Sequence, residues 1–250
     1  MGGHSHWSQV KRAKGVADNK RGALFTKLGR EITVAGREGG STDIDANFRL
    51  RLAVQRARDA NMPNETIERA IKRGGGGGDA NDLAEITYEG YGPSGVAIIL
   101  EVVTDNRNRS VSEIRSAMTR GGGNLGEAGC VSWLFDSKGV IIVEAGDRDP
   151  DEIVLAAIDA GAEDVDVVDS SVEVHTRTED LEQVRRALQE HDFKIESAEL
   201  TKLAKTTISL GEKEALQTLK LLDRLEELED VQRVHSNADF PDEVLAAYSD

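Results

Sequence analysis

The segment from Gly3 to Gly40 holds a group of side chains that could bind a polyanion. It contains eight cations and only three acids, Asp18, Glu31 and Glu38. The cations are Lys11, Arg12, Lys14, Lys20, Arg21, Lys27, Arg30 and Arg37. Because lysine and arginine neutralise phosphates and release their counterions, this composition predicts nucleic-acid binding. The alternative is a solvated helical surface that only keeps the segment soluble.

The charge of this segment is opposite to that of the rest of the chain. Residues 1–78 hold 15 Lys and Arg against 8 Asp and Glu, whereas residues 79–250 hold 16 against 38. The whole chain of 250 residues carries a formal net charge of −15. Such an asymmetry indicates a polyanion-binding end on an acidic body.

Part of this segment has the pattern of an amphipathic helix. From Arg21 to Arg37 the apolar residues fall on one helical face, and a separate arc holds the basic strip, which consists of Lys20, Lys27, Arg30 and Arg37. We expect this strip to contact phosphates and to be replaceable without loss of the fold, because it lies off the apolar face. Trp7, just upstream, could stack on a base; the alternative is an anchor in the core.

Arg107 and Arg109 form a second candidate site, because they lie in the segment TDNRNRS at the predicted start of a helix. Acids are the usual residues there, since the helix dipole is positive at its N-terminus. Two arginines and the free backbone amides would together favour an anion such as phosphate. The alternative is that the arginines pair with Glu101 or Asp105.

No set of residues predicts catalysis, a cofactor or a metal site. His4 and His6 have no cysteine or carboxylate ligands nearby, and the single cysteine, Cys130, excludes a disulfide framework. The carboxylates fall in charged runs such as residues 147–152 and 226–230, which are typical of a surface. An enzyme remains a second class of protein to consider, and a metal or nucleotide bound to the purified chain would support it.

The sequence predicts neither a secreted protein nor a membrane protein. The N-terminus lacks the apolar core of a signal peptide, and no run approaches the roughly 18 apolar residues that a membrane span needs. The sequence has no heptad repeat of apolar residues that would predict a coiled-coil dimer. We therefore expect a cytoplasmic monomer without membrane contact.

The residue pattern around these cations predicts a helical domain over residues 1–78. Helices are expected at 7–19, 21–37 and 46–60, and from Pro63 to Arg73. Further cations lie on the last two, and nearby acids are expected to neutralise some of them: Arg49, Arg51, Arg56, Arg58, Lys72 and Arg73. The glycines 74–78 have no strand before them and no lysine after them, which favours a flexible linker over a phosphate-binding loop.

The remainder predicts an α+β fold with three domains in all. Strands are expected at 85–89, 96–103 and 130–135, with a helix capped by Asp105 and stopped by the glycines at 121–126. Residues 139–201 have the order β-α-β-β-α-β of a ferredoxin-like domain. A helix at 212–229 and a strand at 231–236 complete the ββαβ begun at Glu85. The predicted domains are 1–78, a discontinuous α+β domain of 79–137 plus 205–250, and an inserted ferredoxin-like domain of 138–204.

Several motifs in this order resemble the YebC family over nearly the whole chain. They are GHSHW, NKRGALFTKLGREITVAGREGG, NFRLRLAV, NMPNETIERAIKRG, YEGYGPSGVA, TDNRNRS and GGNLGEAGCVSWLF. That family includes bacterial proteins classed as probable transcriptional regulators and a mitochondrial translational activator of a cytochrome oxidase subunit. His6 departs from it, because lysine is commoner at this position.

The charge pattern and the resemblance together predict a non-enzymatic, nucleic-acid-binding regulator of gene expression. The resemblance implies a transcriptional regulator that binds DNA, or alternatively a ribosome-associated translation factor that binds ribosomal RNA. The spread of cations over several helices suits folded RNA at least as well as a duplex groove. A protein-binding adaptor is the third possibility, and it predicts no salt-dependent affinity for nucleic acid.

Overall fold

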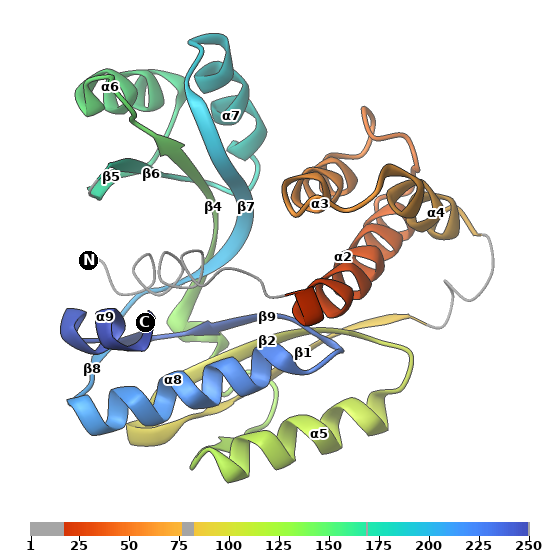
Figure 1. Cartoon of the computed structure of the whole chain (residues 1–250), viewed down its shortest axis with the longest axis vertical. Coiled ribbons are helices and arrows are strands. Elements are labelled where there is room, and N and C mark those ends of the chain that lie inside the picture. The colour runs from red at the N-terminus through yellow and green to blue at the C-terminus, as the bar shows by residue number, and fades with distance from the viewer. Residues whose placement is uncertain (1–17, 77–82, 169, 250) are drawn as a thin grey trace. The chain divides into compact units, whose positions relative to one another are not determined.

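The computed structural model of the chain describes residues 18–76, 83–168 and 170–249 (Figure 1). They form two compact units: Met1–Phe135 together with Ala204–Asp250, and Asp136–Leu203. The secondary structure is mixed, with helices and antiparallel sheets, which confirms the predicted α+β class. The helix predicted at 7–19 lies almost entirely outside the described residues.

In the part of the first unit that the structure describes, three helices come first and pack around an apolar core. They are α2 (Asp18–Glu38), α3 (Phe48–Asp59) and α4 (Asn64–Gly74). The core is made by the apolar face of α2, including Leu28 and Ile32, and by the inward residues of α3 and α4. Asn47 caps α3, since its side-chain oxygen accepts from the backbone N–H of Leu50 at 3.0 Å. Its amide nitrogen donates to the carbonyl of Ala35 at 2.8 Å, which joins the cap to α2.

The prediction that glycines 74–78 form a flexible linker is wrong for Gly74. It is the last residue of α4 and is buried against α2. A Cβ at Gly74 would lie 2.6 Å from the carbonyl oxygen of Thr33 and 3.2 Å from the Cα of Gly36. The first glycine of the run therefore permits close packing of two helices. Residues 77–82 lie outside the described range.

The sheet of the first unit has the strand order β3-β1-β2-β9. Its strands are antiparallel, and the C-terminal strand pairs with β2, as the ββαβ prediction requires. The bounds are β1 (Ala84–Tyr91), β2 (Ala97–Thr104), β3 (Asn124–Leu125) and β9 (Val231–Ser236). Two helices, α5 (Arg107–Arg120) and α8 (Glu212–Glu227), lie side by side on one face of this sheet (Figure 1). Ile98 and Leu100 of β2 are buried against them.

Shorter elements complete the first unit. They are the 3-10 helices η2 (Pro93–Gly95) and η3 (Ser132–Leu134), the paired strands β8 (Ile208–Ser209) and β10 (Ala238–Asp239), and α9 (Asp242–Ser249). The strand predicted at 130–135 is wrong, since residues 130–131 form a bend, residues 132–134 form η3, and a strand begins only at Phe135. The cause is Glu89, whose buried carboxylate accepts the backbone N–H groups of Gly129, Val131 and Ser132 at 2.8 Å each.

The second unit follows the predicted succession of strand, helix, strand, strand, helix and strand. Its elements are β4 (Phe135–Glu144), α6 (Pro150–Ala160), β5 (Asp164–Val168), β6 (Ser171–Thr176), α7 (Leu181–Glu190) and β7 (Lys194–Ala204). The sheet order is β5-β6-β4-β7. Asp149 caps α6 and Gly161 ends it with φ +104°. The helix therefore has the bounds that Pro150 and the following glycine predict.

Candidate nucleic-acid interface

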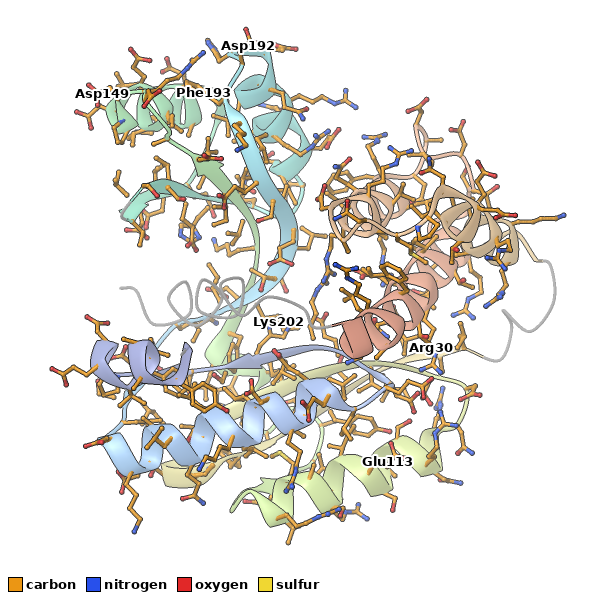
Figure 2. All side chains as sticks on the ribbon, in the orientation of Figure 1. Arg30, Glu113, Asp149, Asp192, Phe193 and Lys202 are labelled. Atoms are coloured by element: carbon orange, nitrogen blue, oxygen red, sulfur yellow. The ribbon has the colours of Figure 1, made fainter. Side chains whose placement is uncertain are left out.

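Arg30, the central residue of the basic strip, is bound within the chain. Its guanidinium donates to Asp230 Oδ1 at 2.6 Å and to Glu229 Oε1 at 2.7 Å. The Arg30 side chain is 16% exposed and that of Asp230 only 3%. Figure 2 labels Arg30 on α2, and the contact joins this helix to the residue that precedes β9. In this structure Arg30 is part of the packing within the first unit.

Asp230 is the centre of a buried hydrogen-bond network. Its carboxylate also accepts from Ser110 Oγ at 2.6 Å, Arg109 Nη2 at 2.9 Å and Thr104 Oγ1 at 3.0 Å. Burial alone raises the pKa of a carboxyl group, but the hydrogen bonds from Ser110, Arg109, Thr104 and Arg30 outweigh it. The pKa of Asp230 is therefore lowered, and the group is held as a carboxylate.

The neighbouring cations of the strip are also in contact with the chain. Lys27 Nζ donates to the carbonyl of Glu226, and Arg37 Nη1 donates to the carbonyl of Leu83 at 2.6 Å. The side chain of Lys20 lies outside the description. The structure contradicts the reason for expecting that Arg30 can be replaced without loss of the fold, because Arg30 lies off the apolar face but binds the buried Asp230. A helical wheel does not show a partner that is remote in sequence. Phosphate binding by the strip stays a prediction.

Glu31 joins α2 to α3 and β9. Its carboxylate accepts from Arg56 Nη1 and from Arg233 Nη2, each at 2.8 Å. Burial raises the pKa of Glu31, but the two guanidinium groups more than compensate and lower it. The acid that interrupts the predicted basic segment therefore holds two arginines in place.

Arg109 pairs with an acid, which is the alternative to anion binding that the sequence left open for the second candidate site. It pairs with Asp105 at 2.7 Å and with the buried Asp230, so the structure gives it a role in packing. The predicted cap is one residue out of place: Asn106 caps α5, since its side chain accepts from the backbone N–H of Arg109 at 3.1 Å. Arg107 is exposed and makes no hydrogen bond or ion pair with the described residues. The two arginines do not form one open anion site.

Three exposed cations of the helical segment have no partner among the described residues. They are Arg58 on α3 and Lys72 and Arg73 at the end of α4. Asp59, Glu65 and Glu68 are the acids expected to neutralise part of the charge of α3 and α4, but among the described residues no ion pair joins them to these three side chains. Arg49 and Arg69 on the same helices are also exposed but have partners, so the lack of a described partner distinguishes these three cations, and the spacing of the sequence does not show it.

The other predicted residues are placed as follows. Arg21 is exposed on the first turn of α2, whereas Trp7, Lys11, Arg12 and Lys14 lie outside the described residues. Within the described ranges, no group of three or more His, Cys, Asp or Glu side chains could hold a metal ion. None of the described helices is long and apolar enough to cross a membrane.

The comparisons with known proteins identify the class of protein. The model of the TACO1/YebC N-terminal domain matches residues 5–77, and that of the TACO1/YebC second and third domain matches residues 83–238. The chain therefore belongs to the TACO1/YebC family.

Its relatives carry the name of a regulator. A "probable transcriptional regulatory protein" of Dehalococcoides mccartyi is 51% identical over 248 residues, which cover 99% of this chain and 98% of that protein. One of the same name from Chloroflexus aurantiacus is 52% identical over 250 residues, with 99% of each chain covered. The crystal structure of a conserved hypothetical protein from Aquifex aeolicus matches with a TM-score of 0.82 and 45% identity, and it covers 90% of this chain and 93% of that one. At the family level this chain is a regulatory protein.

Proposed function

We propose that the chain is a non-enzymatic transcriptional regulator that binds DNA through its basic helical segment. The observation that carries the proposal is the set of exposed cations Arg58, Lys72 and Arg73, which have no partner among the described residues and lie on a segment whose net charge is opposite to that of the chain. A guanidinium or ammonium group without an acidic partner is free to neutralise a phosphate. The names of the relatives support regulation of transcription.

The N-terminal residues add to this surface. We propose that Lys11, Arg12, Lys14, Lys20 and Arg21 contact the phosphodiester backbone, and that Trp7 stacks on a base. These contacts set affinity and register rather than sequence preference, because phosphates are the same in every sequence.

The remaining predicted residues have a subordinate role. Lys27, Arg30, Arg37 and Arg109 each have a partner within the chain, so each would have to exchange a carboxylate or a carbonyl for a phosphate. The charge of Arg30 is already balanced by its acids, so moving Arg30 to a phosphate would take a cation away from those acids and gain little. Arg107 needs no exchange, and we include it among the phosphate contacts.

We propose three domains for this regulator, with residues 138–204 as an inserted ferredoxin-like domain. The strand-helix-strand-strand-helix-strand order and the sheet order β5-β6-β4-β7 support this description. The chain acts as a cytoplasmic monomer without a cofactor, and DNA is the partner of its helical domain.

The test is the affinity for duplex DNA as a function of salt. Replacing Arg58, Lys72 and Arg73 by Gln removes three exposed cations that make no hydrogen bond or ion pair with the described residues, so circular dichroism and the melting temperature should stay the same. The log–log salt slope should flatten by about one unit for each lost phosphate contact. If the wild-type chain binds duplex DNA without salt dependence, or if the variant binds as tightly with the same slope, the assignment to this segment is wrong.

A second candidate is a translation factor that binds ribosomal RNA. The spread of cations over α2, α3 and α4 favours it, because a base-reading protein usually inserts one exposed helix into a groove. Preferential binding of ribosomal RNA over duplex DNA, lost in the same triple variant, would establish this alternative.

A further inference from the structure

The outward faces of α5 and α8 carry cations that the proposed function does not use. On α8, Lys213, Lys220 and Arg224 are exposed and make no hydrogen bond or ion pair with the described residues. On α5, Arg115 has the same properties. These four residues form what we call the α5/α8 face. They are unusual, because residues 79–250 hold more than twice as many acids as bases.

The cations of α8 lie in one row. Lys213, Gln217, Lys220 and Arg224 have the spacing i, i+4, i+7 and i+11, which places them along one side of a helix. The row spans about 16 Å at a rise of about 1.5 Å per residue. The opposite side of α8 is buried in the core through residues such as Leu219 and Leu222. Packing therefore fixes the direction in which the row faces.

The two helices present one continuous surface. Gln217 Nε2 donates to the carbonyl of Gly121 at 3.0 Å, which ties the middle of the α8 row to the end of α5. Arg115 and its neighbours Ser112 and Thr119 are on the side of α5 away from the buried Ile114 and Met118. Figure 1 shows α5 and α8 side by side on the same face of the sheet.

The acids of these helices do not neutralise the row. Among the described residues no ion pair joins Glu113, labelled in Figure 2 and the single acid of α5, to a cation. Asp223 of α8 accepts the hydroxyl of Tyr248 at 2.7 Å, on the side of α9. At the spacing of a helix, Glu212 falls on that same side of α8. Glu227 lies near the row, seven residues after Lys220, but among the described residues no ion pair joins it to Lys220 or Arg224.

The chemistry of the surface indicates its ligand. The large hydrophobic residues that are exposed among those described are Trp133, Leu155, Ile158 and Val167, and none of them lies on α5 or α8. Protein interfaces need an apolar or aromatic centre, which this surface lacks. Rows of unpaired cations with short hydroxyl side chains between them suit a phosphodiester backbone instead.

We propose that the α5/α8 face is a second DNA-binding surface, which holds the backbone of a duplex without reading its sequence. The inference rests on the proposed function, because it extends DNA binding from the helical segment to the acidic part of the chain. It assigns to Lys213, Lys220, Arg224 and Arg115 the role of phosphate contacts.

The experiment measures binding of the full chain to a random-sequence DNA duplex of about 30 base pairs at several salt concentrations. The variant replaces Lys213, Lys220 and Arg224 by Gln. The log–log salt slope should fall by about two to three units, since each contact contributes about 0.9. The affinity at the lowest salt concentration should drop at least tenfold. Unchanged circular dichroism checks that the fold is intact.

The matched control removes the same number of charges elsewhere. Arg177, Arg186 and Lys194 are 58%, 60% and 74% exposed on the second unit, and they too are replaced by Gln. The control should bind DNA much as the wild-type chain does. Equal weakening of both variants would show a general effect of net charge and overturn the inference.

Two further outcomes separate the inference from the function on which it rests. If the variant at Arg58, Lys72 and Arg73 weakens binding but the α8 variant does not, the second surface is wrong and the proposed function stands. If the wild-type chain binds folded RNA and not duplex DNA, both proposals for DNA are overturned.

Discussion

Asp230 lies just before β9 and accepts hydrogen bonds from side chains of β2, α5 and α2. It is 2% exposed, and its lowered pKa keeps it charged. A buried, paired carboxylate of this kind stabilises the folded state little more than a well-packed apolar residue would. Its removal is costly, however, because its buried partners are left without a hydrogen-bond acceptor or an opposite charge. Asp230 is therefore one of the residues on which the junction between the helical segment and the sheet depends, together with Glu31.

Replacing Asp230 by Ala should lower the free energy of unfolding by about 3–5 kcal/mol, because Arg30 and Ser110 lose their acceptor. Urea denaturation followed by circular dichroism measures the change. Glu229→Ala is the matched control, since Glu229 binds the same arginine but is 61% exposed. The control should lose less than about 1 kcal/mol. Similar losses for the two variants would contradict the role given to Asp230.

The same network predicts a pH dependence. The folded state lowers the pKa of Asp230, so its contribution is fully present above the unfolded pKa of about 3.9. It is lost as the pH falls below that value toward the folded pKa. The stability difference between the wild-type chain and Asp230→Asn should therefore be constant above about pH 5 and shrink below about pH 4. A difference that is the same at every pH would mean that folding does not lower the pKa of Asp230.

At this scale the sequence could be interpreted only in part. The charge of Arg30 and its position on the polar arc of α2 follow from the spacing of the residues. Its partner lies 200 residues away and cannot be found from that spacing. Arg109 was easier, because Asp105 is only four residues from it and pairing was already an alternative.

The packing of α2 against α4 depends on small residues at the crossing. Gly74 and Gly36 approach each other closely, and Gly74 also lies against the carbonyl of Thr33. Gly22, on the exposed start of α2, has no neighbouring atom within 4 Å of a Cβ placed there. A methyl group added at Gly74 would therefore clash with α2, whereas one added at Gly22 would meet no neighbouring atom.

Gly74→Ala should destabilise the chain by about 1–3 kcal/mol, because the added methyl group overpacks the crossing. Gly22→Ala should instead stabilise it by up to about 1 kcal/mol, since alanine is the better helix former. Thermal unfolding of the two single variants measures both effects. A neutral or stabilising Gly74→Ala would show that α4 does not need this close approach.

Elements were predictable where local residues determine them. Asp149, Pro150 and Gly161 bound α6 at both ends, and the periodicity of α2 is clear from its apolar residues. The run CVSWLF at 130–135 reads as a strand, but Glu89, some forty residues away, binds its backbone amides. Gly74 was assigned to a linker because a glycine run does not show which of its members packs against another helix.

The distribution of charge over the whole molecule could be predicted from the sequence only in part. Counting residues shows that the basic end and the acidic body differ in sign. It does not show that Arg30 and Glu31 serve the packing of the first unit, or that Lys213, Lys220 and Arg224 form one exposed row. Those facts depend on which face each helix buries.

The central claim is that this member of the TACO1/YebC family acts on DNA in the cell. The most direct measurement crosslinks the chain in growing cells and sequences both the DNA and the RNA attached to it. The account predicts enrichment of promoter DNA that survives RNase and falls in the variant at Arg58, Lys72 and Arg73. Recovery of ribosomal RNA from one region, without a promoter signal and lost in the same variant, would contradict it.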